Sequence, residues 1–160
     1  MIKILEIDNI QMKLEFWDTA GQERFRSVIQ QYYNDSQGAV VVFDLTNPKS
    51  FSELKYWVQQ LRDFADPCLI KMLLGNKSDI MTENRIPQEE IDKFCSLNDF
   101  IYYETSAKVN KNIDTCFLEL AKKIKDKFYI TKKNSYEKNS DTLIKLKENN
   151  KKPQNEECKC

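Results

Sequence analysis

The sequence contains no histidine and only three glycines among its 160 residues. Without an imidazole group, neither Ser-His-Asp catalysis nor a histidine-ligated metal site can be built. The glycines are Gly21, Gly38 and Gly75, and they stand too far apart for the G-x-x-x-x-G-K-[ST] loop that wraps nucleotide phosphates. These residues therefore do not encode a conventional phosphate-binding loop.

Cysteine pairs and long apolar runs are also missing. The cysteines stand at positions 68, 95, 116, 158 and 160 without a C-x-x-C motif, which argues against zinc and thioredoxin-like redox sites. Cys68, Cys95 and Cys116 lie inside apolar or amphipathic segments, so we expect buried free thiols in a reducing compartment. The sequence shows no signal peptide and no apolar run of about 18 residues. We therefore expect a cytoplasmic protein, or one attached to the cytosolic face of a membrane.

Neither sign of charge is in excess, because 25 Lys and Arg residues balance 25 Asp and Glu residues. This balance gives no electrostatic reason to expect nucleic acid as a partner. Charge is nevertheless uneven, since residues 129–160 contain eight Lys and five acidic residues, whereas 1–128 are mildly acidic. From Tyr129 onward Lys, Asn, Ser and Glu dominate, and apolar residues are too few to form a core. We predict one folded domain over 1–128 and a flexible tail over 129–160.

The apolar pattern predicts alternating strands and helices. Apolar residues alternate over 2–17 around the turn signal Asp8-Asn9, which is typical of a β-hairpin. Later continuous apolar runs are typical of parallel strands buried on both faces, and segments of helical spacing separate them, the first capped by Asn47-Pro48. We therefore expect an α/β doubly wound fold with a mostly parallel sheet. The predicted strands are 39–43, 70–74 and 101–103, and the predicted helices are 48–65, 88–97 and 113–124.

Three polar motifs follow predicted strands, at the edge where such sheets bind ligands. They read WDTAGQERF at 17–25, GNKSD at 75–79 and ETSAK at 104–108. The Asp79 carboxylate can accept two hydrogen bonds from the ring N–H and the exocyclic amine of guanine, a donor pair that adenine lacks. Asn76 can bond to the ring edge and brace neighbouring loops, and the stem of Lys77 can cover the base. Backbone N–H groups near Ser106 and Ala107 can meet the guanine carbonyl oxygen.

The first motif offers groups for nucleotide phosphates. Asp18 follows an apolar strand, the position where a carboxylate holds Mg²⁺ directly or through water. Gly21 has no side chain, so its N–H can approach a γ-phosphate closely. Gln22 is the residue type that orients the attacking water in GTP hydrolysis. Taken one at a time, these residues have plainer interpretations, because Asp18 can cap a turn and Asn76-Lys77 can be an ordinary polar loop.

The run WDTAGQERF, followed in order by NKSD and TSAK, resembles the Ras superfamily of small GTPases over roughly residues 1–128. The resemblance implies a Ras-type P-loop NTPase G domain, an α/β fold that binds GTP or GDP with Mg²⁺ and hydrolyses GTP. In that family Gln22 would be the catalytic residue, and Asp18 would hold Mg²⁺ through water. The residues that inherit nucleotide-binding roles are Asp18, Gly21, Asn76, Lys77, Asp79, Ser106, Ala107 and Lys108.

The segment Cys158-Lys159-Cys160 differs from the C-a-a-X box that Ras- and Rho-like proteins usually carry. Together with WDTAGQERF and Tyr32-Tyr33, it makes the resemblance one to Rab proteins, in which a terminal cysteine pair carries two geranylgeranyl groups. Two lipids agree with membrane physics, because a single chain gives only marginal anchoring. The alternative interpretations are two unmodified, solvent-exposed cysteines or a chance metal site.

By the same resemblance, the sequence is truncated and lacks the family's first strand, phosphate loop and switch I threonine. In a Ras-type sheet the first strand lies between the third and fourth strands, which are 13–17 and 39–43 here. Two apolar strands then lose a partner, and each buried unpaired backbone group costs about 1–3 kcal/mol against a total stability of about 5–15 kcal/mol. We expect these 160 residues alone neither to fold stably nor to hold GTP tightly.

The resemblance implies a monomeric switch in vesicle traffic, attached reversibly to the cytosolic face of endomembranes. Its implied partners are an exchange factor, a GTPase-activating protein, an escort protein for prenylation, a dissociation inhibitor and effectors, without nucleic acid. Two alternatives stay open: a non-hydrolysing module that binds Rab regulators or effectors, and a member of a Ras- or Rho-like branch. Core packing and an effector surface fit four aromatic residues equally well, namely Trp17, Phe25, Tyr32 and Tyr33.

Overall fold

The computed structural model describes residues 1–18, 33 and 35–129. Its contacts divide the chain into two compact units, Met1–Ile124 and Lys125–Cys160. The second unit begins with a short π-helix, η2 (Lys125–Tyr129). From position 130 onward the predicted flexible tail lies outside the described residues, and so do Cys158 and Cys160. No helix in the described ranges is long and apolar enough to cross a membrane.

The amino-terminal segment forms the predicted hairpin. Strand β1 (Ile2–Ile7) pairs antiparallel with β2 (Ile10–Glu15). Asp8 and Asn9 connect the strands with φ angles of 53° and 61°. Two positive φ angles match the twist of a two-residue hairpin loop, and Asp and Asn tolerate this region better than other residues with a side chain. The prediction is confirmed, although β2 ends before Trp17.

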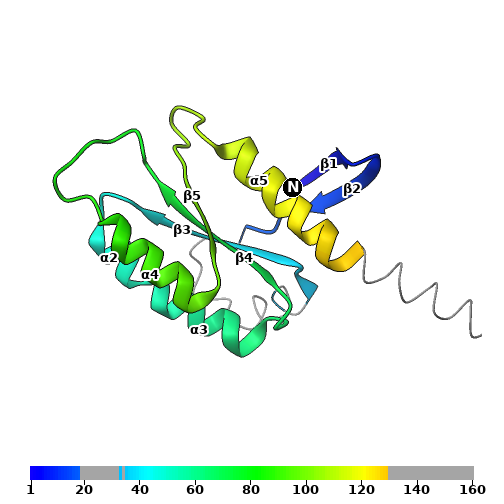
Figure 1. Cartoon of the computed structure of the whole chain (residues 1–160), viewed down its shortest axis with the longest axis horizontal. Helices are drawn as coiled ribbons and strands as arrows, with labels where there is room; N and C mark the ends of the chain where they lie inside the picture. Colours follow the sequence, from blue (N-terminus) through cyan, green and yellow to red (C-terminus); the bar gives the residue numbers. More distant parts are fainter. Residues whose placement is uncertain (19–32, 34, 130–160) are drawn as a thin grey trace, which may run out of the picture. The chain divides into compact units, whose positions relative to one another are not determined.

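Three parallel strands form the main sheet, in the order β3, β4, β5 (Figure 1). Strand β3 (Gly38–Asp44) pairs with β4 (Ile70–Asn76), which in turn pairs with β5 (Ile101–Glu104). All three predicted strands are confirmed, and each extends to a polar residue at its carboxyl end. The extension has a simple cause, because the ladder is made by backbone groups and does not require an apolar side chain.

Helices cover both faces of this sheet (Figure 1). They are α2 (Pro48–Ser52), α3 (Leu54–Phe64), α4 (Gln88–Asn98) and α5 (Ile113–Ile124). The alternation of β4 sends Leu73 into a core with α3 and α4, whereas Met72 and Leu74 pack against Cys116 and Leu120 of α5. Because both faces are covered, Met72, Leu73 and Leu74 form an uninterrupted apolar run in the middle of β4. The predicted α/β class, with a parallel sheet flanked by helices, is confirmed.

The first predicted helix is interrupted. Asn47 caps it as expected, since its side-chain oxygen accepts a hydrogen bond from the Lys49 N–H at 3.1 Å. The prediction of one continuous helix is wrong, because a turn at Glu53 separates α2 from α3. The Ser52 hydroxyl donates to the Lys49 carbonyl oxygen at 2.7 Å, and such side-chain bonds compete with the regular helical ladder.

The cysteine prediction is right for two positions and wrong for one. Cys95 and Cys116 are buried, and burial raises the pKa of both thiols, that of Cys95 to about 11. Cys68 is exposed. The Cys68 N–H donates to the Asp66 carboxylate at 2.6 Å, so a tight turn precedes β4 and leaves the thiol on the surface.

The hairpin and the parallel sheet are separate sheets in the part of the chain that the structure describes. Strand β3 is an edge strand there, and its Val42 is 55% exposed, whereas Leu73 of the central strand is fully buried. The hairpin packs on α5 instead, with the rings of Phe16 and Phe117 edge to face at 5.3 Å. The truncation expected from the sequence, and the low stability expected from it, stay predictions.

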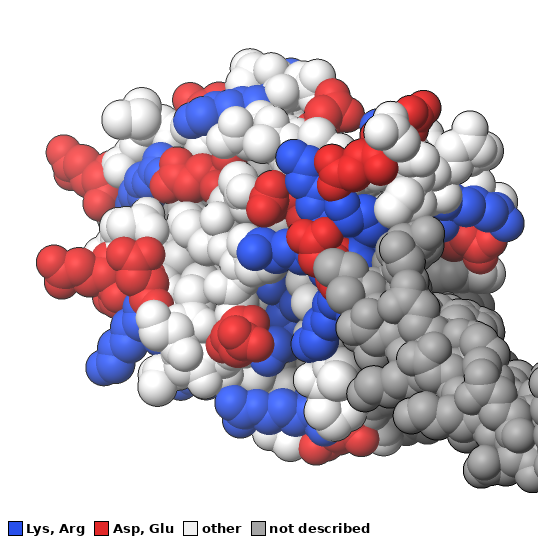
Figure 2. All heavy atoms as spheres, turned by 45° about the vertical axis from the view of Figure 1, so that its right-hand side comes forward, with Lys and Arg blue, Asp and Glu red and all other residues white. Residues whose placement is uncertain are grey.

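Charged side chains of both signs are interspersed on the face shown in Figure 2. In the hairpin, Lys13 Nζ lies 2.6 Å from the Glu15 carboxylate, and Lys3 Nζ lies 3.3 Å from Asp114 of α5. These side chains are largely exposed, so such pairs contribute little to stability. The face in Figure 2 presents no extended surface of a single charge sign.

Candidate nucleotide-binding site

The strand ends bring two of the three sequence motifs together. Asp44 at the end of β3 stands opposite Asn76 at the end of β4. Backbone hydrogen bonds then join the loops that follow β4 and β5. The Thr105 N–H donates to the Gly75 carbonyl oxygen at 2.9 Å, and the Ser78 N–H donates to the Thr105 carbonyl oxygen at 3.0 Å. The two loops therefore form one continuous surface at the carboxyl edge of the sheet.

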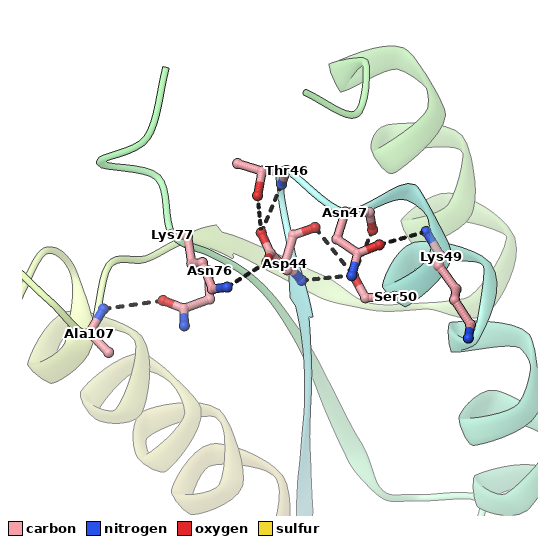
Figure 3. A network of polar contacts seen from close by, with 8 residues as sticks. All are labelled: Asp44, Thr46, Asn47, Lys49, Ser50, Asn76, Lys77 and Ala107. Carbon is pink, nitrogen blue, oxygen red and sulfur yellow. Dashed lines mark hydrogen bonds and ion pairs between the residues drawn. The ribbon is translucent and has the colours of Figure 1, made fainter. Parts of the chain in front are cut away.

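Asn76 links these loops through its side chain. Its Oδ1 accepts a hydrogen bond from the Ala107 N–H at 3.1 Å (Figure 3). The Ser106 N–H donates to the Lys111 carbonyl oxygen, also at 3.1 Å. Both N–H groups that the sequence assigns to the guanine carbonyl oxygen thus already have acceptors. That assignment stays a prediction, and it requires one of these bonds to open or to be shared.

The Asp79 carboxylate is fixed by a buried hydroxyl. Ser106 is fully buried, and its hydroxyl donates to Asp79 Oδ1 at 2.5 Å. This hydrogen bond is the main reason that the pKa of Asp79 lies below its ordinary value; partial burial opposes the shift, and the nearby charges of Lys108 and Lys77 add to it. Asp79 is therefore ionised at neutral pH. An ionised carboxylate only accepts hydrogen bonds, which suits a partner that presents two N–H donors.

Lys77 is held at its backbone and at its side chain. Its φ angle of 63° lies in the left-handed region, which costs a non-glycine residue about 1–2 kcal/mol. Its Nζ lies 2.7 Å from Asp44 Oδ2, and Asp44 Oδ1 accepts hydrogen bonds from the Thr46 N–H at 2.8 Å and the Thr46 hydroxyl at 2.7 Å. Burial raises the pKa of Asp44, but the bonds from Lys77 and Thr46 outweigh burial and lower it.

Asp18 lies apart from these loops in sequence and is exposed after the end of β2. Among the described residues, no three His, Cys, Asp or Glu side chains gather closely enough to hold a metal ion. A single exposed carboxylate fits Mg²⁺ only where phosphate and water oxygens complete the coordination shell. Gly21 and Gln22 lie outside the described residues, so their predicted roles stay predictions.

The aromatic residues divide between surface and core. Trp17 is 61% exposed. Tyr33 packs against the core formed with α3 and α4, and burial raises the pKa of its hydroxyl. Phe25 and Tyr32 lie outside the described residues. Of the two roles that the sequence left open, the structure thus favours exposure for Trp17 and packing for Tyr33.

Sequence reasoning missed Asp44, Thr46 and the hydroxyl of Ser106. Asp44 directly follows the apolar run 39–43, at the end of a predicted strand. The rule that ligands bind at strand ends would therefore have found it. The bond between Ser106 and Asp79 joins residues 27 positions apart. No local pattern signals such a contact.

Comparison with known proteins gives a consistent result. The model of the Ras family matches residues 1–126. Ras-related protein Rab-8A of Gallus gallus is 41% identical over 126 residues, which cover 79% of this chain and 61% of that protein. Rab-37 of Homo sapiens is 39% identical over 123 residues, and the GTP-binding protein YPT1 of Saccharomyces cerevisiae is 38% identical over 125 residues; these matches cover 77% and 78% of this chain. The chain spans 55–61% of the length of these relatives.

Proposed function

Because this chain belongs to the Ras family and is a Rab-like small GTPase, we propose that it acts as a GTP-binding and GTP-hydrolysing switch in vesicle traffic. The observation that carries the proposal is the Asp79 carboxylate, fixed 2.5 Å from the Ser106 hydroxyl at the carboxyl edge of a parallel sheet. Ligands of α/β sheets bind at this edge.

Base recognition falls to the two loops that the structure joins. The ionised Asp79 accepts from the ring N–H and the exocyclic amine of guanine, while adenine would leave this carboxylate unpaired. Asn76 holds the Ala107 loop in place through a 3.1 Å hydrogen bond. The aliphatic stem of Lys77 packs on the base, and Ser106 with Lys108 keeps Asp79 charged. Guanine is thus the base whose donors match this site.

Phosphate binding and hydrolysis fall to the motif that begins at Asp18. We assign Asp18 to Mg²⁺ through water, the Gly21 N–H to the γ-phosphate, and Gln22 to orientation of the attacking water. Mg²⁺, when bound, neutralises the charge that develops on the phosphate oxygens during transfer. The sequence has no G-x-x-x-x-G-K-[ST] loop. These 160 residues on their own are therefore expected to hold nucleotide weakly and to be inactive in hydrolysis.

Membrane attachment is the second half of the proposed function. Cys158 and Cys160 would carry geranylgeranyl groups, and two lipids give the stable but reversible anchoring that one cannot. The protein would then sit on the cytosolic face of endomembranes as a monomer. Its partners would be an exchange factor, a GTPase-activating protein, an escort protein, a dissociation inhibitor and effectors.

A second candidate function is a non-hydrolysing module that binds Rab regulators or effectors. One observation favours it: Trp17, which follows the end of β2, is 61% exposed. Large exposed aromatic residues are common at the centre of protein interfaces. A chain of this kind would meet Rab partners without turning over GTP.

One preparation separates the two candidates: native protein extracted from the membranes of its own cells, with its intact mass and GTP hydrolysis measured. The switch predicts hydrolysis and a mass above 19.0 kDa by about 4–6 kDa, which fits two lipids and a further strand, loop and helix of roughly 30 or more residues. The binding module predicts a mass near 19.0 kDa plus lipids and no hydrolysis. An unlipidated protein would contradict the membrane role in both cases.

A further inference from the structure

Asp44 has two carboxylate oxygens with separate partners. Oδ1 accepts from the Thr46 N–H at 2.8 Å and from the Thr46 hydroxyl at 2.7 Å. Oδ2 is thereby directed to Lys77 Nζ, at 2.7 Å. The Asp44 side chain is 19% exposed, whereas that of Lys77 is 52% exposed. The carboxylate is thus the fixed member of the pair, and the lysine is the member that reaches toward solvent.

The main chain of Asp44 is anchored as well. The Asp44 N–H donates to Ser50 Oγ at 3.0 Å, and the Ser50 hydroxyl donates to the Asn47 carbonyl oxygen at 2.8 Å. Asn47 in turn caps α2 through the Lys49 N–H at 3.1 Å. Figure 3 shows this network running from the start of α2, through Asp44, to Asn76 and Lys77 at the end of β4. Asp44 is therefore connected by hydrogen bonds to the capped start of α2.

Lys77 is consequently held at its backbone and, through Nζ, at the tip of its side chain. Its backbone lies in the left-handed region at φ 63°, directly after Asn76, whose carbonyl oxygen accepts from the Leu45 N–H at 3.0 Å. Its Nζ is held on the neighbouring strand by Asp44. The methylene stem therefore extends from the end of β4 toward Asp44 at the end of β3.

We propose that Asp44 is a positioning residue for base recognition, which holds the stem of Lys77 in place to pack on a guanine ring. The inference rests on the proposed function, since it assumes that this edge binds guanine. Lysine loses much rotamer freedom when it is ordered. If Asp44 orders Lys77 before the base arrives, this loss no longer weakens binding, which is the general benefit of preorganisation.

The test measures guanosine binding by the full chain at low temperature. Adenosine serves as the control for specificity toward the guanine base. Asp44→Asn is expected to weaken guanosine binding by roughly twofold to fivefold, the upper part of the range for a partly exposed ion pair. In a Lys77→Met background, which keeps an unbranched apolar side chain without the charge, Asp44→Asn is expected to have no further effect. Glu15→Gln breaks a comparable pair with Lys13 at 2.6 Å in the hairpin and is expected to leave binding unchanged.

Each other result overturns the inference. Unchanged or tighter binding of Asp44→Asn would show that Asp44 does nothing, or that it competes with the base for Lys77. An equal loss in both backgrounds would show a purely structural role. If Asp44→Asn fails to fold, Thr46→Val removes one hydrogen bond from Oδ1 and is expected to give a smaller loss that also disappears with Lys77→Met. Wild-type protein that is folded by circular dichroism and yet binds no guanosine would remove the proposed function itself, whereas the other outcomes leave it standing.

Discussion

The loops at the carboxyl edge of the parallel sheet and the amino-terminal hairpin are built in opposite ways. At the sheet edge, Ser106 and Thr105 are 0% and 1% exposed, and their hydrogen bonds reach three neighbouring segments. In the hairpin Ile4 is 68% exposed, and just after the hairpin Trp17 is 61% exposed. Rigid, buried loops suit the recognition of a flat base with fixed donors. The proposed base recognition and the proposed phosphate binding therefore fall on different parts of this chain, which can be tested separately.

The largest expected effect is a difference in guanosine binding between substitutions of Asp79 and of Asp18. Asp79→Asn should weaken guanosine binding by about a hundredfold, because it replaces two hydrogen bonds to an ionised acceptor with bonds to a neutral amide that also presents unwanted donors. Asp18→Asn should change guanosine binding less than twofold or so, because a nucleoside has no phosphate for a magnesium ion to meet. Titration of both variants by NMR is the measurement, and equal losses would contradict the division between the two regions.

Two glycines give the next effect. A methyl group at Gly75 would lie 2.6 Å from Tyr102 Oη and 2.9 Å from Leu45 Cδ2, inside the packed sheet. Gly75→Ala should therefore lower the free energy of unfolding by about 1–3 kcal/mol. At Gly38 the nearest atom is the flexible end of Ile124, at 2.8 Å, so Gly38→Ala should cost less. Urea denaturation ranks the two variants, and the reverse order would show that the carboxyl edge is not the tightly packed region.

Two buried serines, Ser78 in the loop after β4 and Ser106 in the loop after β5, should respond differently to substitution by alanine. The Ser106 hydroxyl is bonded to Asp79, so Ser106→Ala should lower the Tm by a few degrees. The Ser78 hydroxyl is buried without a hydrogen-bond partner among the described residues. Removing an unpaired buried hydroxyl relieves a cost of about 1–3 kcal/mol, so Ser78→Ala should be neutral or stabilising. A destabilised Ser78→Ala variant would mean that this hydroxyl has a partner in solution.

Acid titration should give the smallest effect. The pKa of Asp79 is lowered first by Ser106, and that of Asp44 is lowered because bonds from Lys77 and Thr46 outweigh burial. A lowered folded-state pKa means that the ionised group stabilises the fold above its ordinary value near 3.8, and that this contribution disappears as the pH falls through the lowered value. Ser106→Ala should lose less stability over this acid range than the wild type, as followed by circular dichroism. A steeper loss would reverse the assigned direction.

Much of the fold was predictable because periodicity reports burial directly. The largely apolar segment 70–74 indicated a buried strand, and Leu73 and Leu74 do enter opposite cores. Asn47 was recognisable as a cap because asparagine is a preferred cap residue and Pro48 suits the first helical turn; its side-chain oxygen does accept from the Lys49 N–H. The turn at Glu53 was not predictable, because Glu53 keeps helical angles of −70° and −16° and only nearby serine bonds mark the break.

The site was predictable in its residue types and less so in its bonds. A rule about strand ends located Asn76 and Asp79, but it could not tell that the Ala107 N–H is already engaged by Asn76. The ion pair between Asp44 and Lys77 depends on the register of β3 and β4, which places Asp44 opposite Asn76 at the ends of the two strands. Sheet register is not visible in the sequence. Cys68 was misjudged for a related reason, because its neighbours are apolar while the turn at Asp66 directs it outward.

The most direct measurement compares guanosine with GDP and Mg²⁺ as ligands of the purified 160-residue chain. If this chain carries base recognition without a phosphate loop, guanosine binds, adenosine does not, and GDP binds no more than about tenfold more tightly than guanosine, a difference of about 1.4 kcal/mol. Binding of GDP that depends on Mg²⁺ and exceeds that of guanosine by several orders of magnitude would contradict this division. It would show that residues 1–160 suffice to hold the phosphates without a G-x-x-x-x-G-K-[ST] loop.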